Sequence, residues 1–191
     1  MTTVGILALQ GAVREHKQAF SDLGIATALV KMPSQLDDVD ALVMPGGEST
    51  TVSLLLQRAE LFEPIQKRLL DGMATFGTCA GMILLAQQIE DGRDDQKCFG
   101  AIDISVQRNG YGAQSASFEA EIKLRDDNAE PFPAVFIRAP RISRVGNDVE
   151  VLAEYKYEAV LCRVGSVLVS SFHPELSNDL RVHDIFAALL N

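Results

Sequence analysis

Short strand-like segments alternate with amphipathic helical segments in the first half of the chain, and this alternation constrains the fold more than any other feature. The strand-like segments are VGILAL (4–9), ATALVK (26–31), ALVMP (41–45) and MATFGT (73–78). The helical segments between and after them are 12–24, 49–58, 64–70 and 80–88. Strands and helices that alternate at this spacing predict a mostly parallel sheet with helices on both faces.

The second half of the chain adds strands of a different kind. Residues 91–133 are more polar and rich in turn residues, and within them AIDISVQR (101–108) and FEAEIKL (118–124) predict antiparallel strands beside the sheet. Four more strand-like segments follow, VFIRAP, VEVLAEY, AVLCRV and SVLVSSF, and then a final helical segment, DLRVHDIFAALL (179–190). There is no internal repeat or linker, so we expect one three-layer α/β domain over residues 1–191.

The composition excludes several classes of function. The chain has 26 Asp+Glu against 17 Lys+Arg and no basic cluster, which argues against binding to nucleic acid or to a membrane surface. Its N-terminus lacks the pattern of a secretory signal, and no apolar run approaches the roughly 18 residues of a membrane span. Three cysteines without CxxC spacing indicate neither a disulfide framework nor a zinc site. We therefore expect a cytoplasmic protein.

Cys79 lies at the joint between the fourth predicted strand and the helix after it, in FGTCAGMILLA (76–86). The pattern G-T-C-A-G is a cysteine version of G-x-S-x-G, the turn that presents a nucleophile at the carboxyl end of a strand. The free N–H groups at the start of the next helix favour a thiolate, and the N–H of Ala80 can point at a developing oxyanion. The alternative is that Cys79 is a small buried core residue, which is what we expect of Cys98 and Cys162.

A thiol nucleophile needs a base, and the chain has three histidines. His16 and His183 lie among polar neighbours on predicted helices, so we expect both to be solvated. His173 ends the segment SVLVSSF and precedes Pro174, which holds the backbone of His173 extended. Glu175 can then accept the Nδ1–H of His173 and leave Nε2 facing the thiol. The alternative is a plain strand-end turn, for which His-Pro-Glu is also suited.

The loop PGGEST (45–50) follows the third predicted strand and lacks the spacing of a nucleotide-binding P-loop. It is a strand-to-helix turn in which Ser49 is well placed to cap the next helix. Two consecutive glycines also allow backbone N–H groups to approach a ligand closely. We therefore expect an oxyanion-hole donor at Gly47 that cooperates with Ala80.

Together, PGGEST, GTCAG and SFHPEL resemble the class I glutamine amidotransferase family, and more narrowly the glutaminase subunits of pyridoxal 5′-phosphate synthases. The resemblance includes VGILALQGAVREH and VFIRAPRI, so it covers nearly the whole chain in the same order. It implies a flavodoxin-like fold and a triad of Cys79, His173 and Glu175. The glutamine-binding positions that it implies are Gly47, Glu48, Ser49, Arg108, Ile137 and Arg138. Without the family, a solvated surface side chain is the simpler interpretation of either arginine.

The same resemblance implies hydrolysis of L-glutamine to L-glutamate and ammonia through a thioester, with no metal or organic cofactor. The ammonia would pass to a docked synthase subunit, a (β/α)₈ barrel in a large heteromeric complex, for synthesis of pyridoxal 5′-phosphate (vitamin B6). We expect docking at Gln10-Gly11 to complete the oxyanion hole. The loop after Arg108 departs from the family, because Tyr111 and Ala113 replace a phenylalanine and an arginine, and the family's contacts around this loop are not carried over.

Three other interpretations stay open. The chain can be the glutaminase subunit of another acceptor enzyme, such as the one in histidine biosynthesis, although LQGAVREH and FIRAP are not expected there. It can be a stand-alone cysteine hydrolase or stress protein of the DJ-1 kind, which predicts neither His-Pro-Glu after the last strand nor a need for a partner. It can also be a non-catalytic binding module on a glutaminase scaffold, against which the complete set of Cys79, His173 and Glu175 argues.

Overall fold

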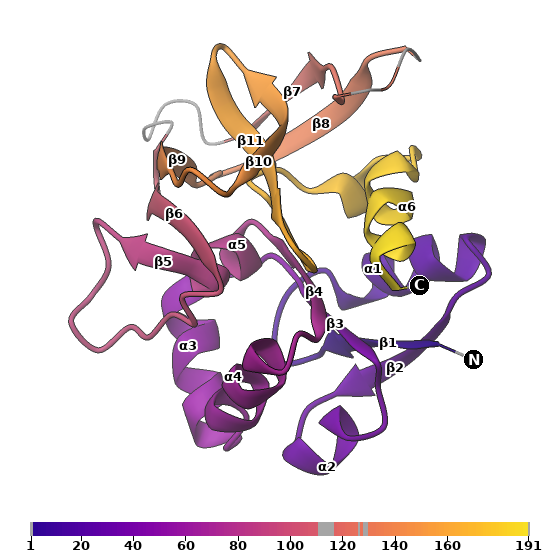
Figure 1. Cartoon of the computed structure of the whole chain (residues 1–191), viewed down its shortest axis with the longest axis vertical. Coiled ribbons are helices and arrows are strands. Elements are labelled where there is room, and N and C mark those ends of the chain that lie inside the picture. Colours follow the sequence, from indigo (N-terminus) through magenta and orange to yellow (C-terminus); the bar gives the residue numbers. More distant parts are fainter. Residues whose placement is uncertain (1, 111–116, 126, 128–129, 191) are drawn as a thin grey trace.

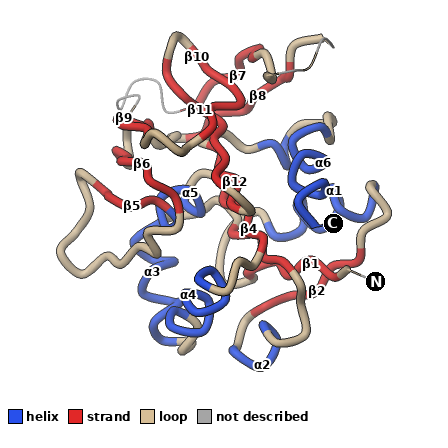
Figure 2. The backbone as a smooth tube through the Cα atoms, viewed as in Figure 1, coloured by secondary structure: helices blue, strands red, loops and turns tan. Residues whose placement is uncertain are grey.

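A seven-stranded sheet forms the centre of the protein (Figure 1, Figure 2). The computed structural model describes residues 2–110, 117–125, 127 and 130–190. In sheet order the strands are β10 (Glu150–Tyr155), β11 (Glu158–Val164), β12 (Val167–Ser170), β4 (Ala74–Thr78), β3 (Ala41–Met44), β1 (Thr3–Leu7) and β2 (Ala26–Val30). The strands from β12 to β2 are parallel, and β11 and β10 extend the sheet in antiparallel pairing. The last strand in the sequence, β12, therefore lies inside the sheet beside β4.

Helices cover both faces of this sheet. The helices of one face are α1 (Val13–Asp22) and α6 (Arg181–Ala187). Those of the other face are α2 (Pro33–Leu36), α3 (Ser49–Arg58), α4 (Phe62–Leu70) and α5 (Ala80–Leu85). Two short 3-10 turns, η1 (Pro174–Leu176) and η2 (Ala188–Leu190), precede and follow α6.

The strand β3 shows why the sheet has a hydrophobic core on each face. All of its residues are buried. Leu42 and Met44 belong to the core that contains α3, α4 and α5, whereas Ala41 and Val43 belong to the core that contains α1 and α6. Successive side chains of a strand point to opposite faces, so a strand covered on both sides is apolar throughout. This arrangement confirms the predicted three-layer α/β fold with a mostly parallel sheet.

Two smaller sheets lie beside the main one. The first contains β5 (Ala86–Ile89), β6 (Ile102–Gln107) and β9 (Arg141–Val145), and β6 pairs in antiparallel fashion with β9. The second is the antiparallel pair of β7 (Ser117–Ile122) and β8 (Phe132–Ile137). Both strands predicted to be antiparallel in the polar stretch are thus confirmed as β6 and β7.

The predicted helix 80–88 is three residues too long, because α5 ends at Leu85. Ala86 turns to an extended backbone (φ −59°, ψ 153°) and begins β5. The N–H of Ala101 donates to the Leu85 carbonyl (2.8 Å), and this contact between segments replaces a helical hydrogen bond. The residues of α5 are all buried, whereas the two glutamines after Ala86 are exposed. The apolar run thus marks the end of the helix better than helix propensity does. The short elements α2 and β9 lie where the sequence predicts no element.

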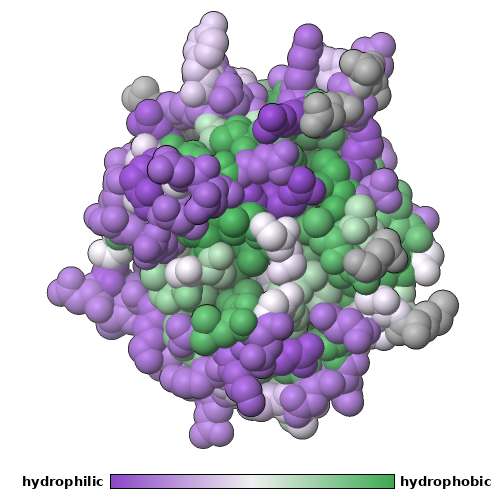
Figure 3. Space-filling model, viewed as in Figure 1, coloured by the Kyte–Doolittle hydropathy of each residue, from purple (hydrophilic) through white to green (hydrophobic). Residues whose placement is uncertain are grey.

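The surface is mixed in character. Figure 3 shows hydrophilic side chains over much of one face, with hydrophobic side chains reaching the surface between them. The exposed large apolar side chains are Leu29, Met32, Leu70, Tyr157 and Leu176. Among the described residues, no helix is both long enough and apolar enough to span a membrane.

Candidate active site

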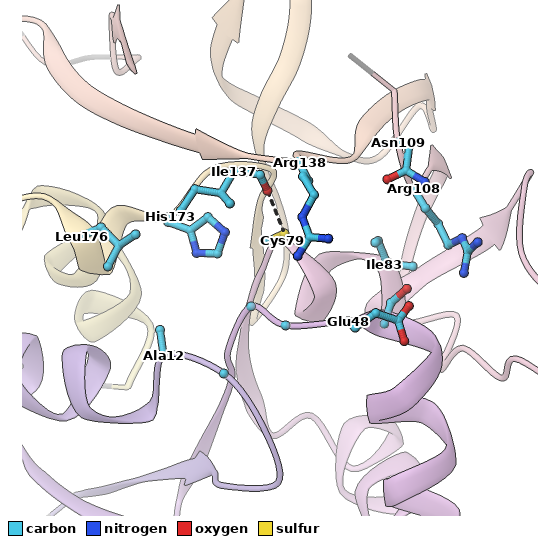
Figure 4. Close-up of a pocket in the computed structure, with 14 residues that line it drawn as sticks. Ala12, Glu48, Cys79, Ile83, Arg108, Asn109, Ile137, Arg138, His173 and Leu176 are labelled. Carbon is cyan, nitrogen blue, oxygen red and sulfur yellow. Dashed lines mark hydrogen bonds between the residues drawn. The ribbon is translucent and has the colours of Figure 1, made fainter. Parts of the chain in front are cut away.

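A cavity of about 420 Å³ lies where the carboxyl ends of several strands meet (Figure 4). Its walls come from the ends of β1, β3, β4, β6, β8 and β12 or from the segments that follow them, which is where open parallel sheets bind ligands. The predicted site residues in these walls are Gly47, Glu48, Ser49, Cys79, Arg108, Ile137, Arg138 and His173. Ala80 and Glu175 lie behind the walls and are buried.

Cys79 occupies a sharp turn between β4 and α5. Its φ of 50° and ψ of −102° lie outside the regions that non-glycine residues favour. Its N–H donates to the carbonyl of Ser170 on β12 (2.8 Å). Gly81 lets α5 approach β3, since a Cβ there would overlap the carbonyl oxygen of Met44. The turn holds Cys79 in the cavity wall, with its Sγ 4.0 Å from the carbonyl oxygen of Ile137.

His173 and Glu175 form a buried pair beside the thiol. His173 Nδ1 donates to Glu175 Oε1 (2.7 Å), and the N–H of His173 donates to the Val135 carbonyl on β8 (2.8 Å). Burial opposes a charge on His173, but hydrogen bonds to Cys79 and Glu175 outweigh it and raise the pKa of His173 to about 10. Burial also raises the pKa of Glu175, but the electrostatic interaction with His16 and the hydrogen bond from His173 outweigh it and lower that pKa. The pair is therefore imidazolium and carboxylate at neutral pH.

The prediction that His16 and His183 are solvated is wrong, because both side chains are fully buried. His16 Nδ1 lies 3.0 Å from His183 Nε2, and His16 Nε2 lies 3.5 Å from Glu175 Oε2 and 3.3 Å from Thr78 Oγ1. Burial lowers the pKa of both rings, that of His183 to about 3. The sequence does contain an indication that His16 is buried: it is four residues before the buried Phe20, so the two side chains share one side of α1. The polar residues next to His16 obscure this indication.

The N-cap of α3 is Glu48 rather than the predicted Ser49. The Glu48 carboxylate accepts hydrogen bonds from the N–H groups of Thr50 (3.1 Å) and Thr51 (2.7 Å). A carboxylate offers two acceptor oxygens and a charge that suits the N-terminal end of a helix. Burial raises the pKa of Glu48, but these hydrogen bonds outweigh burial and lower it. Ser49 is the first helical residue, and its Oγ accepts from Gln96 Nε2 instead (3.0 Å).

Gln96, which the sequence does not single out, joins two of the predicted binding positions. Its Nε2 donates to Ser49, and its Oε1 accepts from Arg108 Nη1 (3.2 Å). The same Arg108 nitrogen donates to Thr50 Oγ1 (2.6 Å). Arg108 is half-buried, and its guanidinium is held by Thr50 and Gln96 rather than solvated. Arg138 is exposed, has a φ of 43°, and extends into the cavity beside Cys79 in Figure 4.

The remaining candidates lie away from these contacts. Cys98 and Cys162 are outside the cavity, and burial raises the pKa of both thiols, that of Cys162 to about 12. Tyr111 and Ala113 fall outside the described residues. Within the described part of the chain, no three His, Cys, Asp or Glu side chains are grouped so that they could hold a metal ion.

Comparisons with known proteins agree with this geometry. Residues 6–190 match the SNO glutamine amidotransferase family. The chain belongs to this family. It is 46% identical over 187 residues to the "Pyridoxal 5'-phosphate synthase subunit PdxT" of Thermotoga sp. (strain RQ2), and the match covers 98% of each protein. It is 48% identical over 194 residues to the protein of that name from Rhodococcus opacus (strain B4), with 98% of this chain and 96% of the relative covered.

A solved structure agrees with the assignment to the glutamine amidotransferases. It is a crystal structure of a glutamine amidotransferase with 44% sequence identity and a TM-score of 0.91, and the match covers 98% of both chains. Membership of the SNO family confirms the resemblance predicted from PGGEST, GTCAG and SFHPEL. The enzyme class, glutamine amidotransferase, follows from it, and an assignment to the DJ-1 kind is left without support.

Proposed function

We propose that this glutamine amidotransferase hydrolyses L-glutamine as the glutaminase subunit of a pyridoxal 5′-phosphate synthase. The names of its PdxT relatives support the assignment. The observation that carries it is the 2.7 Å pairing of His173 with Glu175 beside Cys79, in one cavity with the PGGEST loop. The chain, residues 1–191, acts as one glutaminase domain in the cytoplasm.

Cys79 is the nucleophile, and its thiolate forms a carbon–sulfur bond to the side-chain amide carbon of glutamine as the carbonyl electrons move to oxygen. The tetrahedral intermediate collapses when His173 gives its proton to the amide nitrogen. Ammonia departs, and a γ-glutamyl thioester on Cys79 remains. His173, now neutral, takes a proton from water while the water oxygen attacks the thioester. Glutamate departs and the thiolate is restored. Glu175 orients the ring of His173 through Nδ1 in both half-reactions.

The oxyanion of both intermediates is held by the N–H groups of Gly47 and Ala80. Ala80 is the first residue of α5, so its N–H has no partner within the helix. The loop that carries Gly47 is tied to the end of β1, because the N–H of Glu48 donates to Gln10 Oε1 (2.9 Å). A partner that shifts Gln10-Gly11 therefore shifts the Gly47 donor as well, and we expect docking to complete the oxyanion hole in this way.

Charged side chains at the cavity walls suit the other end of the substrate. The α-carboxylate of glutamine binds the guanidinium groups of Arg108 and Arg138, since a guanidinium matches a carboxylate in geometry and charge. The Glu48 carboxylate is available for the α-ammonium group. Ser49 and Ile137 complete the wall that the substrate contacts.

The ammonia passes to a synthase subunit, a (β/α)₈ barrel, within a large heteromeric complex. Free ammonia protonates at neutral pH and diffuses away, so the acceptor site has to be connected to the glutaminase site by a path closed to bulk solvent. The residues Ala12 and Leu176 line the cavity, and the Leu176 side chain is 43% exposed. We place the docking surface at these apolar residues, next to Gln10-Gly11.

The test measures glutamate released from glutamine by the chain alone and by the chain mixed with a barrel synthase subunit. We expect a weak rate that rises strongly on mixing, and a Cys79→Ala protein that is inactive in both cases. A strong rate without partner would remove the docking proposal but keep the triad. A Cys79→Ala protein with the full rate would rule out the thioester scheme. Absence of activity in every mixture would point to another acceptor enzyme.

A further inference from the structure

We propose that His16 is a positioning residue for the triad: it holds Glu175 from the side opposite His173, and His183 in turn fixes the tautomer of His16. This proposal rests on the triad proposed above. It gives a role to two buried histidines that the hydrolysis scheme does not use.

The four side chains form a continuous buried line. Glu175 Oε1 lies 2.7 Å from His173 Nδ1, and Glu175 Oε2 lies 3.5 Å from His16 Nε2. His16 Nδ1 lies 3.0 Å from His183 Nε2. The line crosses three separate elements, since His16 is on α1, His183 is on α6 and Glu175 is on η1, and α1 and α6 both pack on η1.

The donor and acceptor of each contact in this line follow from the environment of His183, the residue farthest from the thiol. His183 Nδ1 is buried and has no hydrogen-bond partner among the described residues. A buried N–H without an acceptor costs more than a bare nitrogen, so the proton of His183 belongs on Nε2 and is donated to His16 Nδ1. His16 must then carry its own proton on Nε2, where it faces Glu175 Oε2 and Thr78 Oγ1. Both carboxylate oxygens of Glu175 thus face a donor.

Buried aromatic rings hold the histidine pair in place. The His183 ring makes edge contacts with Phe20 (centroids 5.2 Å apart) and Phe76 (5.8 Å). His16 also packs edge-on against Phe76 (6.0 Å). Neither histidine reaches solvent, so their polar contacts are those within the line and the one from His16 Nε2 to Thr78 Oγ1.

The consequence of this arrangement is a carboxylate that stays charged although it is buried. The titratable groups that face Glu175 are His173 on its own turn and His16 on α1, and those around His16 are Glu175, His173, His183 and Glu15. Glu175 Oε2 has no hydrogen-bond partner among the described residues, and the N–H of His16 faces it at 3.5 Å. Without this facing N–H the buried oxygen would lose a favourable electrostatic contact, and the protonated carboxyl would become more favourable. A neutral Glu175 stabilises the imidazolium of His173 less and orients its ring beside Cys79 less firmly.

The experiment follows alkylation of Cys79 by iodoacetamide between pH 4 and 9, read at that cysteine by peptide mass spectrometry. The readout needs neither glutamine nor a partner. His16→Leu removes the donor, His16→Gln keeps an amide donor that can reach Glu175, and His183→Phe removes only the group that fixes His16. Glu175→Gln tests the triad by itself, and thermal unfolding checks that each variant is folded.

We expect His16→Leu to lower alkylation at pH 7 about tenfold and to move its acid limb at least one pH unit upward. His16→Gln should restore most of the rate, and His183→Phe should move the limb in the same direction by less. A lower alkylation rate with the acid limb of the pH profile unchanged would mean that His16 has a structural role only, and it would overturn the proposal.

Unchanged alkylation in Glu175→Gln would remove the triad itself. Slow alkylation in Glu175→Gln, together with alkylation of His16→Leu at the wild-type rate, would support the triad and reject the role of His16. If His16→Leu does not fold, His183→Phe decides in its place, and an acid limb identical to the wild type rejects the proposal.

Discussion

Gly46 lies directly against the imidazole of His173. A Cβ at position 46 would overlap Cε1 of the ring and would stand 3.1 Å from Nδ1 and 3.4 Å from the Cβ of Cys79. The close fit of this loop against the base therefore depends on the absence of a side chain at the second residue of PGGEST.

We expect Gly46→Ala to push the His173 ring away from the thiol and to lower kcat/KM for glutamine about 100-fold, which is the size of effect that a displacement of about 1 Å produces. Steady-state kinetics with the synthase subunit present would measure it. Gly92→Ala is the matched control, because Gly92 is exposed and its nearest neighbour is the side chain of Ile89, away from the cavity. Normal kinetics in Gly46→Ala would show that the loop yields to the extra methyl group.

His173 should remain protonated well above the pH at which an ordinary histidine loses its proton. Its pKa is raised because its bonds to Cys79 and Glu175 outweigh burial, so Cys79→Ala removes part of the cause and should lower it. Titration of the His173 ring by NMR would measure the pKa in both proteins. The contribution of a raised pKa to stability is complete below about 6.5 and is lost as the pH rises toward about 10. An unaltered titration in Cys79→Ala would contradict the interaction between the two side chains.

Acid should destabilise the protein through its two buried histidines. The pKa values of His16 and His183 are lowered by burial, so the unfolded chain binds protons below about pH 6.5 that the folded protein does not accept. As the pH is lowered below about 6.5, the free energy of unfolding should therefore decrease by up to about 1.4 kcal/mol per pH unit for each histidine.

The measurement is urea unfolding at steps from pH 7 to pH 5. His183 contributes throughout this range, because its pKa in the folded state is about 3. Replacing it in His183→Phe should reduce the slope of the free energy of unfolding against pH by about 1.4 kcal/mol per pH unit, the contribution of one proton. Glu175 has a lowered pKa and loses its contribution only below about pH 4.5, so it does not contribute in this window. A pH dependence as steep as that of the wild type would show that His183 is not buried in its neutral form.

Gln96→Ala should raise KM for glutamine about tenfold and leave kcat nearly unchanged. Gln96 bridges Ser49 and Arg108, so its loss removes one of the hydrogen bonds that position the guanidinium we assign to the substrate carboxylate. A hydrogen bond to a charged group contributes about 1.5–3 kcal/mol. Gln107→Ala is the control, since Gln107 donates to Glu90 on the surface (2.8 Å). A fall in kcat with KM unchanged would assign Gln96 to the chemical step instead of to binding.

Local patterns carry much of the fold and of the candidate site. The apolar run ALVM is buried on both faces as β3, and the residues quoted in PGGEST, GTCAG and SFHPEL each follow the carboxyl end of a strand. Parallel strands bring such ends to one edge, so three motifs that are far apart in the sequence could be placed together before any coordinates were considered.

What could not be predicted depends on contacts between distant segments. Gln96 meets Ser49 across 47 residues, and His16 meets His183 across 167. Neither polar residue has a local pattern that names its partner, and the neighbours of both histidines are polar enough to suggest solvent. Ala86 leaves the helix because β6 offers its backbone a partner, which no helix propensity records.

The place of β12 in the sheet has a consequence for the order in which the enzyme becomes competent during synthesis. A ribosome translates Cys79 long before it reaches Val167–Ser170, and until then β4 has no neighbour on that side. The base His173, the carboxylate Glu175 and the buried His183 all follow β12 in the sequence. A nascent chain can therefore expose its thiol but cannot consume glutamine. Its competence begins with the closing of its longest-range strand pairing, which is also the slowest kind of contact to form.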